Sequence, residues 1–168
     1  MPKGTQGNNA SVYENARIAV ILPCHNEGKA ITHVIESFRK VIPSAQIIVI
    51  DNASKDDTAV KAHDAGAVVI SETLPGKGNA VRRGFSEVEA DIYVMADGDG
   101  TYDATALPEL IKRLVAERLD MVVGTRAEKE EAAYRSGHRI GNRLFNTVFA
   151  KLFGPRFTDI FSGYRVFS

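Results

Sequence analysis

The stretch QIIVIDNASKDDTAVKAHDA, residues 46–65, shows the pattern on which the architecture depends. Its apolar start has no alternating polar residues, which is typical of a strand that helices cover on both faces. A polar cluster at residues 51–54 follows, and a helical pattern over residues 56–65 comes next. Ser54 and Asp57 have the spacing of a capping box, with aspartate in the place of glutamate, which predicts where that helix begins. A strand that leads through a polar loop into a helix is the repeating unit of a parallel α/β sheet.

The same alternation of apolar runs and helical patterns extends in both directions. It predicts strands at residues 17–22, 67–71, 92–96 and 121–124, and helices at residues 29–41, 79–88, 105–117 and 139–152. The chain stops in what reads as the beginning of one more strand, at residues 166–168. We therefore expect an α/β domain of three layers, with a mostly parallel, Rossmann-like sheet between helices, truncated at its C-terminus.

Composition limits what the chain can be. With 168 residues, of which 44% are apolar and 25% charged, it has the profile of one globular domain. Residues 1–16 are polar and are expected to form a disordered tail, which leaves residues 17–168 as the folded domain. Lysine plus arginine equals aspartate plus glutamate at 21 each, so no bulk charge attracts nucleic acid.

The single cysteine, Cys24, cannot form a disulfide within the chain, and we expect it to be a small buried residue in a reducing compartment. The first 16 residues lack the apolar centre of a secretory signal. No run approaches the ~18 apolar residues that a membrane span needs. These features predict a cytoplasmic protein.

Polar clusters follow three of the predicted strands. They are PCHNE at residues 23–27, DNAS at residues 51–54 and DGDGTYD at residues 97–103. Each cluster alone would be an ordinary loop, because Asp, Asn and Gly favour turns. In open α/β sheets, however, ligands bind beyond the carboxyl ends of the strands. If the strand order is 3-2-1-4, the three clusters line one crevice.

The cluster at residues 97–103 places three carboxylates close together. Crowded carboxylates repel unless a cation or protons intervene. Mg²⁺ or Mn²⁺ takes one or two protein carboxylates and completes its shell with water and substrate phosphates, so Asp97 and Asp99 suit a metal bound with a diphosphate. A calcium loop is excluded, because Tyr102 and Pro108 stand where glycine and an acidic residue are needed. A plain turn remains the alternative.

Several familiar motifs are absent. Residues 76–78, GKG, have neither the spacing of a P-loop nor that of a dinucleotide fingerprint. A looser interpretation, in which residues 75–78 open a helix whose N–H groups face an anion, stays open beside that of a simple loop. The histidines lack metal-ligand spacing, and no Gly-x-Ser-x-Gly elbow is present, so nucleophilic hydrolysis is unsupported.

Taken together and in order, six motifs carry a family resemblance. They are LPCHNE at residues 22–27, VIDNASKD at 49–56, GKGNA at 76–80, DGDGTY at 97–102, VGTR at 123–126 and TDIFSGYR at 158–165. From about Ile18 to its last residue the chain resembles family-2 glycosyltransferases of the GT-A fold. Within them it resembles the polyprenyl-phosphate sugar synthases of the dolichyl-phosphate mannose synthase type.

The resemblance implies a nucleotide-sugar site and a metal site in the domain at residues 17–168. The residues expected to bind the nucleotide-diphospho-sugar are Pro23, Glu27, Asp51, Lys77, Asp97 and Asp99. Within this set, Asp51 would contact the base or ribose and Lys77 would lie near the diphosphate. Asp97 and Asp99 would hold Mg²⁺ or Mn²⁺, with Asp99 as the main ligand.

The resemblance also implies an acceptor side. Arg126 and Arg139 would bind an acceptor phosphate, and Asp159 with the following SGYR at residues 162–165 would form the element that closes this side. The expected catalytic residues are Asp99, Arg126 and Asp159. Residues 126–156 contain seven basic and three acidic side chains, which suits a phosphate.

The implied reaction is inverting transfer of a sugar from a UDP- or GDP-sugar to polyprenyl or dolichyl phosphate. The expected partners are this donor, the lipid acceptor and a membrane surface, with the protein at its cytoplasmic face and acting in cell-envelope glycan synthesis. A sugar-hydroxyl acceptor is the alternative, and Asp159 would then be the general base. A sugar nucleotidyltransferase is disfavoured, because residues 23–27 lack its glycine-rich first loop. A receiver-like, Mg²⁺-binding signalling module is a more distant alternative. A receiver has an acidic pair after its first strand, where this chain has HNE at residues 25–27.

Overall fold

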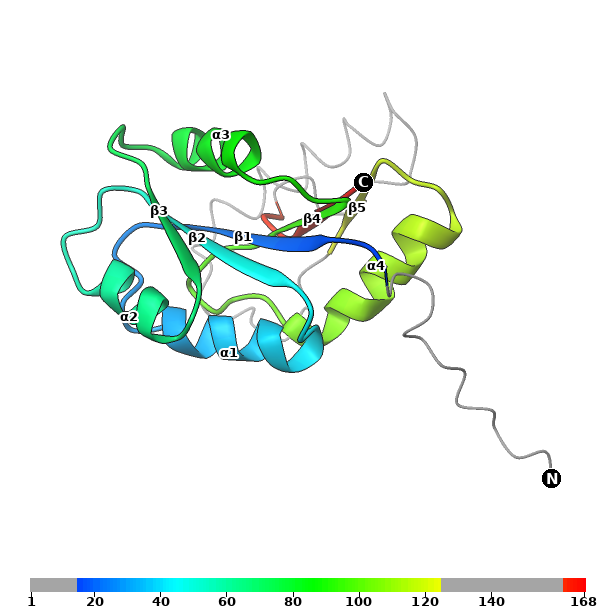
Figure 1. Cartoon of the computed structure of the whole chain (residues 1–168), viewed down its shortest axis with the longest axis horizontal. Helices are drawn as coiled ribbons and strands as arrows, with labels where there is room; N and C mark the ends of the chain where they lie inside the picture. Colours follow the sequence, from blue (N-terminus) through cyan, green and yellow to red (C-terminus); the bar gives the residue numbers. More distant parts are fainter. Residues whose placement is uncertain (1–14, 125–161) are drawn as a thin grey trace, which may run out of the picture.

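The computed structural model describes residues 15–124 and 162–168. These residues build a six-stranded sheet with helices on both sides (Figure 1). The strands are β1 (Ile18–Cys24), β2 (Gln46–Asp51), β3 (Val68–Ser71), β4 (Ile92–Met95), β5 (Met121–Val123) and β6 (Arg165–Phe167). The helices are α1 (Ile31–Val41), α2 (Thr58–Asp64), α3 (Lys77–Glu87) and α4 (Leu107–Ala116), with a turn of 3₁₀ helix, Ala104–Ala106, before α4.

The strand order is β3-β2-β1-β4-β6-β5. The neighbours β3, β2, β1 and β4 pair in parallel, which confirms the predicted order 3-2-1-4. Strand β6 runs antiparallel to both β4 and β5, and Val166 pairs with Val94 on one side and Val122 on the other. The sequence predicted a strand start near residue 166 but not its place. Its insertion brings residues 162–164 beside the end of β4.

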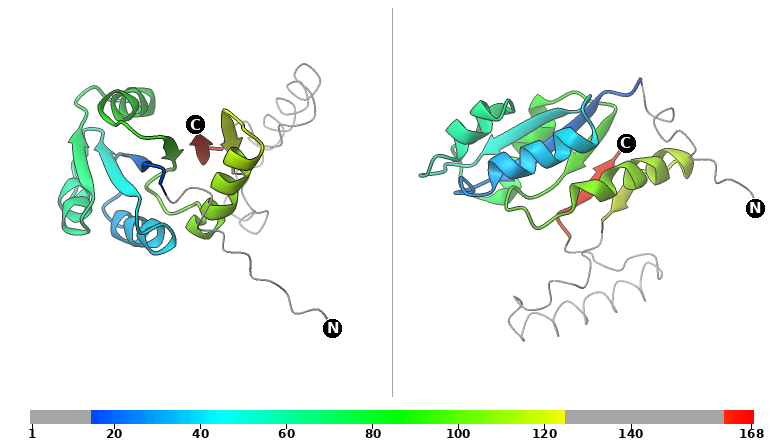
Figure 2. Two further views of the ribbon diagram at one scale, coloured as in Figure 1. Left: turned by 45° about the vertical axis from the view of Figure 1, so that its right-hand side comes forward. Right: turned by 90° about the horizontal axis from the view of Figure 1, so that it is seen from below.

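The sheet separates two apolar cores, because both faces of its central strands are buried. Helices α1, α2 and α4 cover one face, where Val20 and Leu22 of β1 belong to the larger core (Figures 1 and 2). Helix α3 covers the other face over Ile21 of β1 and Ile50 of β2. Every residue of β1 is buried, as the uninterrupted apolar run predicted. The three-layer α/β architecture is thereby confirmed.

Each of the four helices in the described residues begins two residues away from its predicted start; α1, α2 and α4 begin later and α3 begins earlier. Helix α2 begins at Thr58, and the capping box does not form, because the Ser54 hydroxyl accepts a hydrogen bond from the Asn26 N–H at 3.0 Å. The Asp56 carboxylate accepts instead from the Thr58 N–H at 3.1 Å. Helix α3 begins at Lys77, two residues earlier than expected, so this lysine belongs to its first turn.

Some predictions fall on residues that the structure does not describe. They are the helix at residues 139–152 and most of the tail at residues 1–16. Within residues 15–124 and 162–168, no helix combines the length and apolarity that crossing a bilayer requires.

Candidate functional site

Four carboxylates gather around one buried thiol at the carboxyl edge of the sheet. Cys24 ends β1 and is 2% exposed, as predicted. Burial raises the pKa of its thiol, and so do the negative charges of Glu27, Asp51, Asp97 and Asp99. These carboxylates follow or end β1, β2 and β4, which are neighbours in the sheet. The structure therefore brings the three polar clusters to one edge.

The Asp-x-Asp loop after β4 lies directly against the end of β1. A Cβ atom added to Gly98 would come 2.3 Å from the Cys24 Sγ and 3.4 Å from the Ile31 Cδ1. Such a contact is far shorter than van der Waals packing allows, so residue 98 must lack a side chain. The contact between Gly98 and Cys24 therefore sets the distance of Asp97 and Asp99 from the end of β1.

The orientation of Asp99 is fixed within its own loop. Its Oδ1 accepts hydrogen bonds from the Thr101 N–H at 2.9 Å and from the Thr101 hydroxyl at 2.8 Å. Glu27 faces this loop, and its pKa is raised by burial and then by the charges of Asp99 and Asp97. The charges of Asp99 and Asp97 thus add to the effect of burial, and a cation near them would relieve this repulsion between carboxylates.

Lys77 supplies a positive charge to this cluster. It is the first residue of α3, and its Nζ forms an ion pair with the Asp97 Oδ1. Both side chains remain partly accessible. The predicted diphosphate-binding lysine therefore reaches one of the two predicted metal ligands.

Asp51 and Pro23 lie on paired strands. Pro23 pairs with Ile50 of β2, so β1 extends farther than predicted. The Asp51 side chain is almost fully buried, and its Oδ1 has no hydrogen-bond partner within the residues that the structure describes. A buried carboxylate oxygen without a donor is costly, and a ligand N–H or O–H at this position would satisfy it.

Two residues that the sequence analysis did not single out anchor the loop after β1. The Thr58 hydroxyl accepts from the Glu27 N–H at 2.8 Å and donates to the Asp56 carboxylate. The other Asp56 oxygen accepts from the Gly28 N–H at 3.0 Å, and the Thr58 hydroxyl is the main cause of the lowered pKa of Asp56. The sequence signal for these hydrogen bonds was the presence of the polar residues Asp56 and Thr58 near the start of a predicted helix.

The segment before β6 also contacts the carboxylates. The Gly163 N–H donates to the Tyr102 hydroxyl at 2.7 Å. A Cβ atom on Gly163 would lie 2.9 Å from an Asp97 carboxylate oxygen, so glycine leaves room for that group. The motif at residues 158–165 thus ends beside Asp97. Its member Asp159, like Arg126 and Arg139, lies outside the described residues.

The described residues offer a metal ion two carboxylates rather than a complete shell. Among them no group of three or more histidine, cysteine or acidic side chains is arranged to hold a metal. If Asp97 and Asp99 hold Mg²⁺ or Mn²⁺, as the sequence predicts, the ion has to take its other ligands from water and phosphate.

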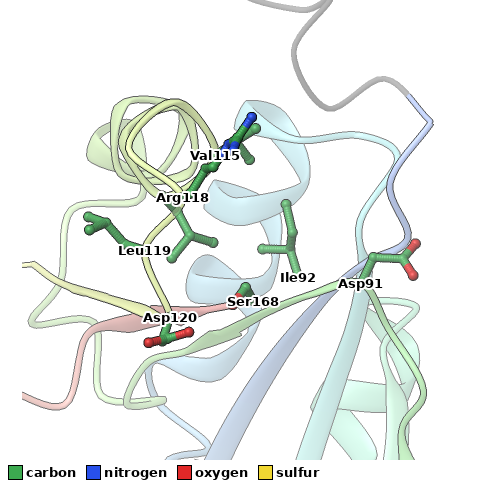
Figure 3. Close-up of a pocket in the computed structure, with 8 residues that line it drawn as sticks. Asp91, Ile92, Val115, Arg118, Leu119, Asp120 and Ser168 are labelled. Carbon is green, nitrogen blue, oxygen red and sulfur yellow. The ribbon is translucent and has the colours of Figure 1, made fainter.

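Two hollows in the described part of the chain lie away from these carboxylates. The larger, of about 300 Å³, lies at the opposite edge of the sheet, where Asp91 precedes β4 and Arg118 follows α4 (Figure 3). The smaller lies on the outer side of α3, near Asn79 and Arg82. The candidate site is therefore identified by its charged side chains and by their position at the carboxyl edge of the sheet, and not by a cavity.

The known proteins similar to this chain include glycosyltransferases. Protein RfbJ of Shigella flexneri is 57% identical over 128 residues, which are 76% of this chain and 99% of that protein. Glycosyltransferase AglJ of Haloferax volcanii is 39% identical over 153 residues, 90% of this chain and 50% of its own. The chain thus spans about half the length of this archaeal relative.

Among solved structures, glucosyl-3-phosphoglycerate synthase of Mycobacterium tuberculosis in complex with Mn²⁺ and UDP-glucose superimposes with a TM-score of 0.77. It is 27% identical, and the match covers all of this chain and 61% of that one. The model of the family described as "Glycosyl transferase family 2" matches residues 19–168. The chain therefore belongs to glycosyl transferase family 2, as its motifs predicted, and has the GT-A fold.

Proposed function

We propose that this chain transfers a hexose from a UDP- or GDP-sugar with the help of Mg²⁺ or Mn²⁺. The observation that carries the proposal is the gathering of four carboxylates and Lys77 at the carboxyl ends of three neighbouring strands. That edge is where open α/β sheets bind ligands. The similar mycobacterial synthase, solved with Mn²⁺ and UDP-glucose, supports this assignment.

On the donor side, each residue has a role that its surroundings favour. The Asp51 Oδ1 accepts a hydrogen bond from the base or ribose, which would satisfy this buried oxygen. Pro23 and Glu27 lie beside the nucleotide. Lys77 leaves Asp97 and turns toward the diphosphate, since an ammonium group binds phosphate as a point charge.

Asp97 and Asp99 would hold the metal ion. When bound, the ion supplies positive charge that stabilises the leaving nucleoside diphosphate. The loop itself contributes orientation, because Thr101 fixes the Asp99 carboxylate before any ligand arrives.

For the acceptor we propose a polyprenyl phosphate bound by Arg126 and Arg139 at the cytoplasmic face of a membrane. A phosphate oxygen is anionic at neutral pH, so it needs positioning rather than a base. Two guanidinium groups can orient it through paired hydrogen bonds. The acceptor then attacks the anomeric carbon in line as the diphosphate leaves, with inversion.

A sugar-hydroxyl acceptor is the second candidate. The similar mycobacterial synthase is named for glucosyl-3-phosphoglycerate and has been solved with phosphoglyceric acid, which supports an acceptor other than a lipid. In that case Asp159 would take the hydroxyl proton.

Removal of metal tests the donor half. We expect UDP or GDP to bind at least about tenfold more weakly in EDTA than in excess Mg²⁺ or Mn²⁺, since the Asp97 and Asp99 charges then repel the diphosphate. Titration calorimetry measures both affinities, and uridine and guanosine serve as controls that should be indifferent to the metal. Equal diphosphate affinity in EDTA and in metal would remove the metal from the site.

The change Arg126→Lys tests the acceptor half. We expect it to leave nucleotide-sugar binding intact and to lower kcat/KM for a polyprenyl phosphate by about 10- to 100-fold, because lysine loses the paired hydrogen bonds of arginine. Transfer of radiolabelled sugar to polyprenyl phosphate in detergent measures it. Arg113→Lys is the control, since the Arg113 side chain forms an ion pair with exposed Glu117, the C-cap residue of α4. Full activity of Arg126→Lys, or an equal loss with an unphosphorylated sugar acceptor, would favour the hydroxyl candidate.

A further inference from the structure

The loop between β3 and α3, residues 72–76, takes its shape from one buried side chain. Asn52 is 5% exposed. Its Nδ2 donates hydrogen bonds to the Leu74 carbonyl at 2.7 Å and the Glu72 carbonyl at 3.2 Å. Its Oδ1 accepts from the Gly76 N–H at 2.7 Å. Both amide donors and the amide acceptor of Asn52 therefore serve the same loop.

The backbone of Asn52 is held from the other side. Its N–H donates to the Cys24 carbonyl at 2.8 Å, and its carbonyl oxygen lies 2.7 Å from the His25 Nδ1, which donates to it. Asn52 thus joins the ends of β1 and β2 to the loop that leads into α3. Because both its backbone and its side-chain amide are hydrogen-bonded, Asn52 keeps this loop at a fixed distance from the ends of β1 and β2.

The bond to Gly76 determines where α3 begins. Gly76 is the N-cap of this helix and has φ 124° and ψ 132°, a conformation that favours glycine. Lys77 follows as the first helical residue, and its Nζ reaches Asp97. Holding the Gly76 N–H therefore fixes the point from which the Lys77 side chain departs.

We propose that Asn52 is a positioning residue for Lys77 and, through Lys77, for the donor diphosphate. The inference rests on the proposed function, because that function places Lys77 at the diphosphate. It goes beyond that function by making the affinity for the diphosphate depend on a residue that touches neither the metal nor the phosphates.

The isosteric change Asn52→Asp tests this proposal. The new carboxylate keeps an acceptor for the Gly76 N–H but turns an oxygen toward the Glu72 and Leu74 carbonyls, which repel it. In excess Mg²⁺ or Mn²⁺ we expect the affinity for UDP or GDP to fall about tenfold or more, as for a lost charge-assisted contact. The affinity for uridine or guanosine, which lack the diphosphate, should stay within about twofold. A purely structural role would weaken both kinds of ligand or neither.

The control Asn79→Asp adds the same charge at the same loop. The Asn79 side chain is half-buried and donates to the Pro75 carbonyl at 3.0 Å and to the Leu74 carbonyl at 3.5 Å, but it does not hold Gly76. We expect less than a threefold change in diphosphate affinity, which is typical of a charge near the surface in salt. An equal loss in both variants would show that the charge, and not the position of Lys77, is responsible, and would overturn the proposal.

A double-mutant cycle with Lys77→Ala tests whether Asn52 affects diphosphate binding through Lys77. If Asn52 acts through Lys77, Asn52→Asp should cost no further diphosphate affinity once the lysine is gone. Additive losses would overturn the proposal. If wild-type protein binds neither UDP nor GDP, the proposed function itself fails. Should Asn52→Asp not fold, the neutral Asn52→Ser takes its place, and failure of both to fold would assign Asn52 to stability alone.

Discussion

Asp99→Asn is expected to lower kcat/KM for sugar transfer by about 100- to 1,000-fold, the range seen when one preorganised electrostatic contact to a reacting group is removed. The asparagine Oδ1 can still accept the two hydrogen bonds from Thr101, so the loop keeps its shape. What is lost is the negative charge that holds the metal at the leaving diphosphate. Rates at increasing Mn²⁺ concentration, together with calorimetry of UDP or GDP, measure the effect.

Asp103→Asn is a closely matched control for this change. Asp103 makes the same turn, accepting from the Thr105 N–H at 2.8 Å and from its hydroxyl at 2.7 Å, but it lies outside the Asp-x-Asp pair. We expect its kcat/KM to stay within about threefold of wild type, since only an exposed charge is removed. Similar losses in the two variants would mean that overall negative charge, rather than a metal at Asp99, explains the result.

The gathering of the three polar clusters at one edge of the sheet was predictable, because the same local pattern recurs along the chain. Each polar cluster follows directly after an apolar run, and parallel strands bring such positions to one edge. The order β3-β2-β1-β4 then confirmed that the clusters adjoin. The roles of the individual side chains remain predictions, now supported by the surroundings of Asp51, Lys77 and Asp99.

What the sequence could not predict depends on contacts between distant segments. Ser54 has the local spacing of a cap, but its hydroxyl serves Asn26, 28 residues away. Strand β6 has only three residues, and its direction depends on pairing with β4, as between Tyr93 and Phe167. In the motif at residues 49–56 the sequence analysis assigned a role to Asp51 and none to its neighbour Asn52. Only the fold shows that its amide holds a loop more than 20 residues later.

The change Gly98→Ala is expected to lower kcat/KM by about 100-fold, because misplacing a reacting group by about 1 Å costs that much. Gly98 does not have the positive backbone φ that would itself forbid alanine, so the obstacle is space: the new methyl group would meet the Cys24 Sγ at 2.3 Å. Since Cys24 is buried beneath the loop, the loop has to rise and carry Asp97 and Asp99 away from Glu27. Gly78→Ala is the control, because a Cβ atom there meets nothing within 4 Å and alanine suits a helix.

The second change Cys24→Ala should restore much of the activity that Gly98→Ala removes. It deletes the sulfur atom that the new methyl group would strike, and the next contact, with the Ile31 Cδ1 at 3.4 Å, is tolerable. Alone, Cys24→Ala should cost about 1 kcal/mol of unfolding free energy for a small cavity and leave kcat/KM within about threefold. In the double variant we expect kcat/KM to recover at least about tenfold over Gly98→Ala, a coupling that independent sites do not show. Steady-state rates and urea unfolding of all four proteins measure the cycle. If Cys24→Ala gives no recovery, the height of the Asp-x-Asp loop is not set by the packing of Gly98 on the end of β1.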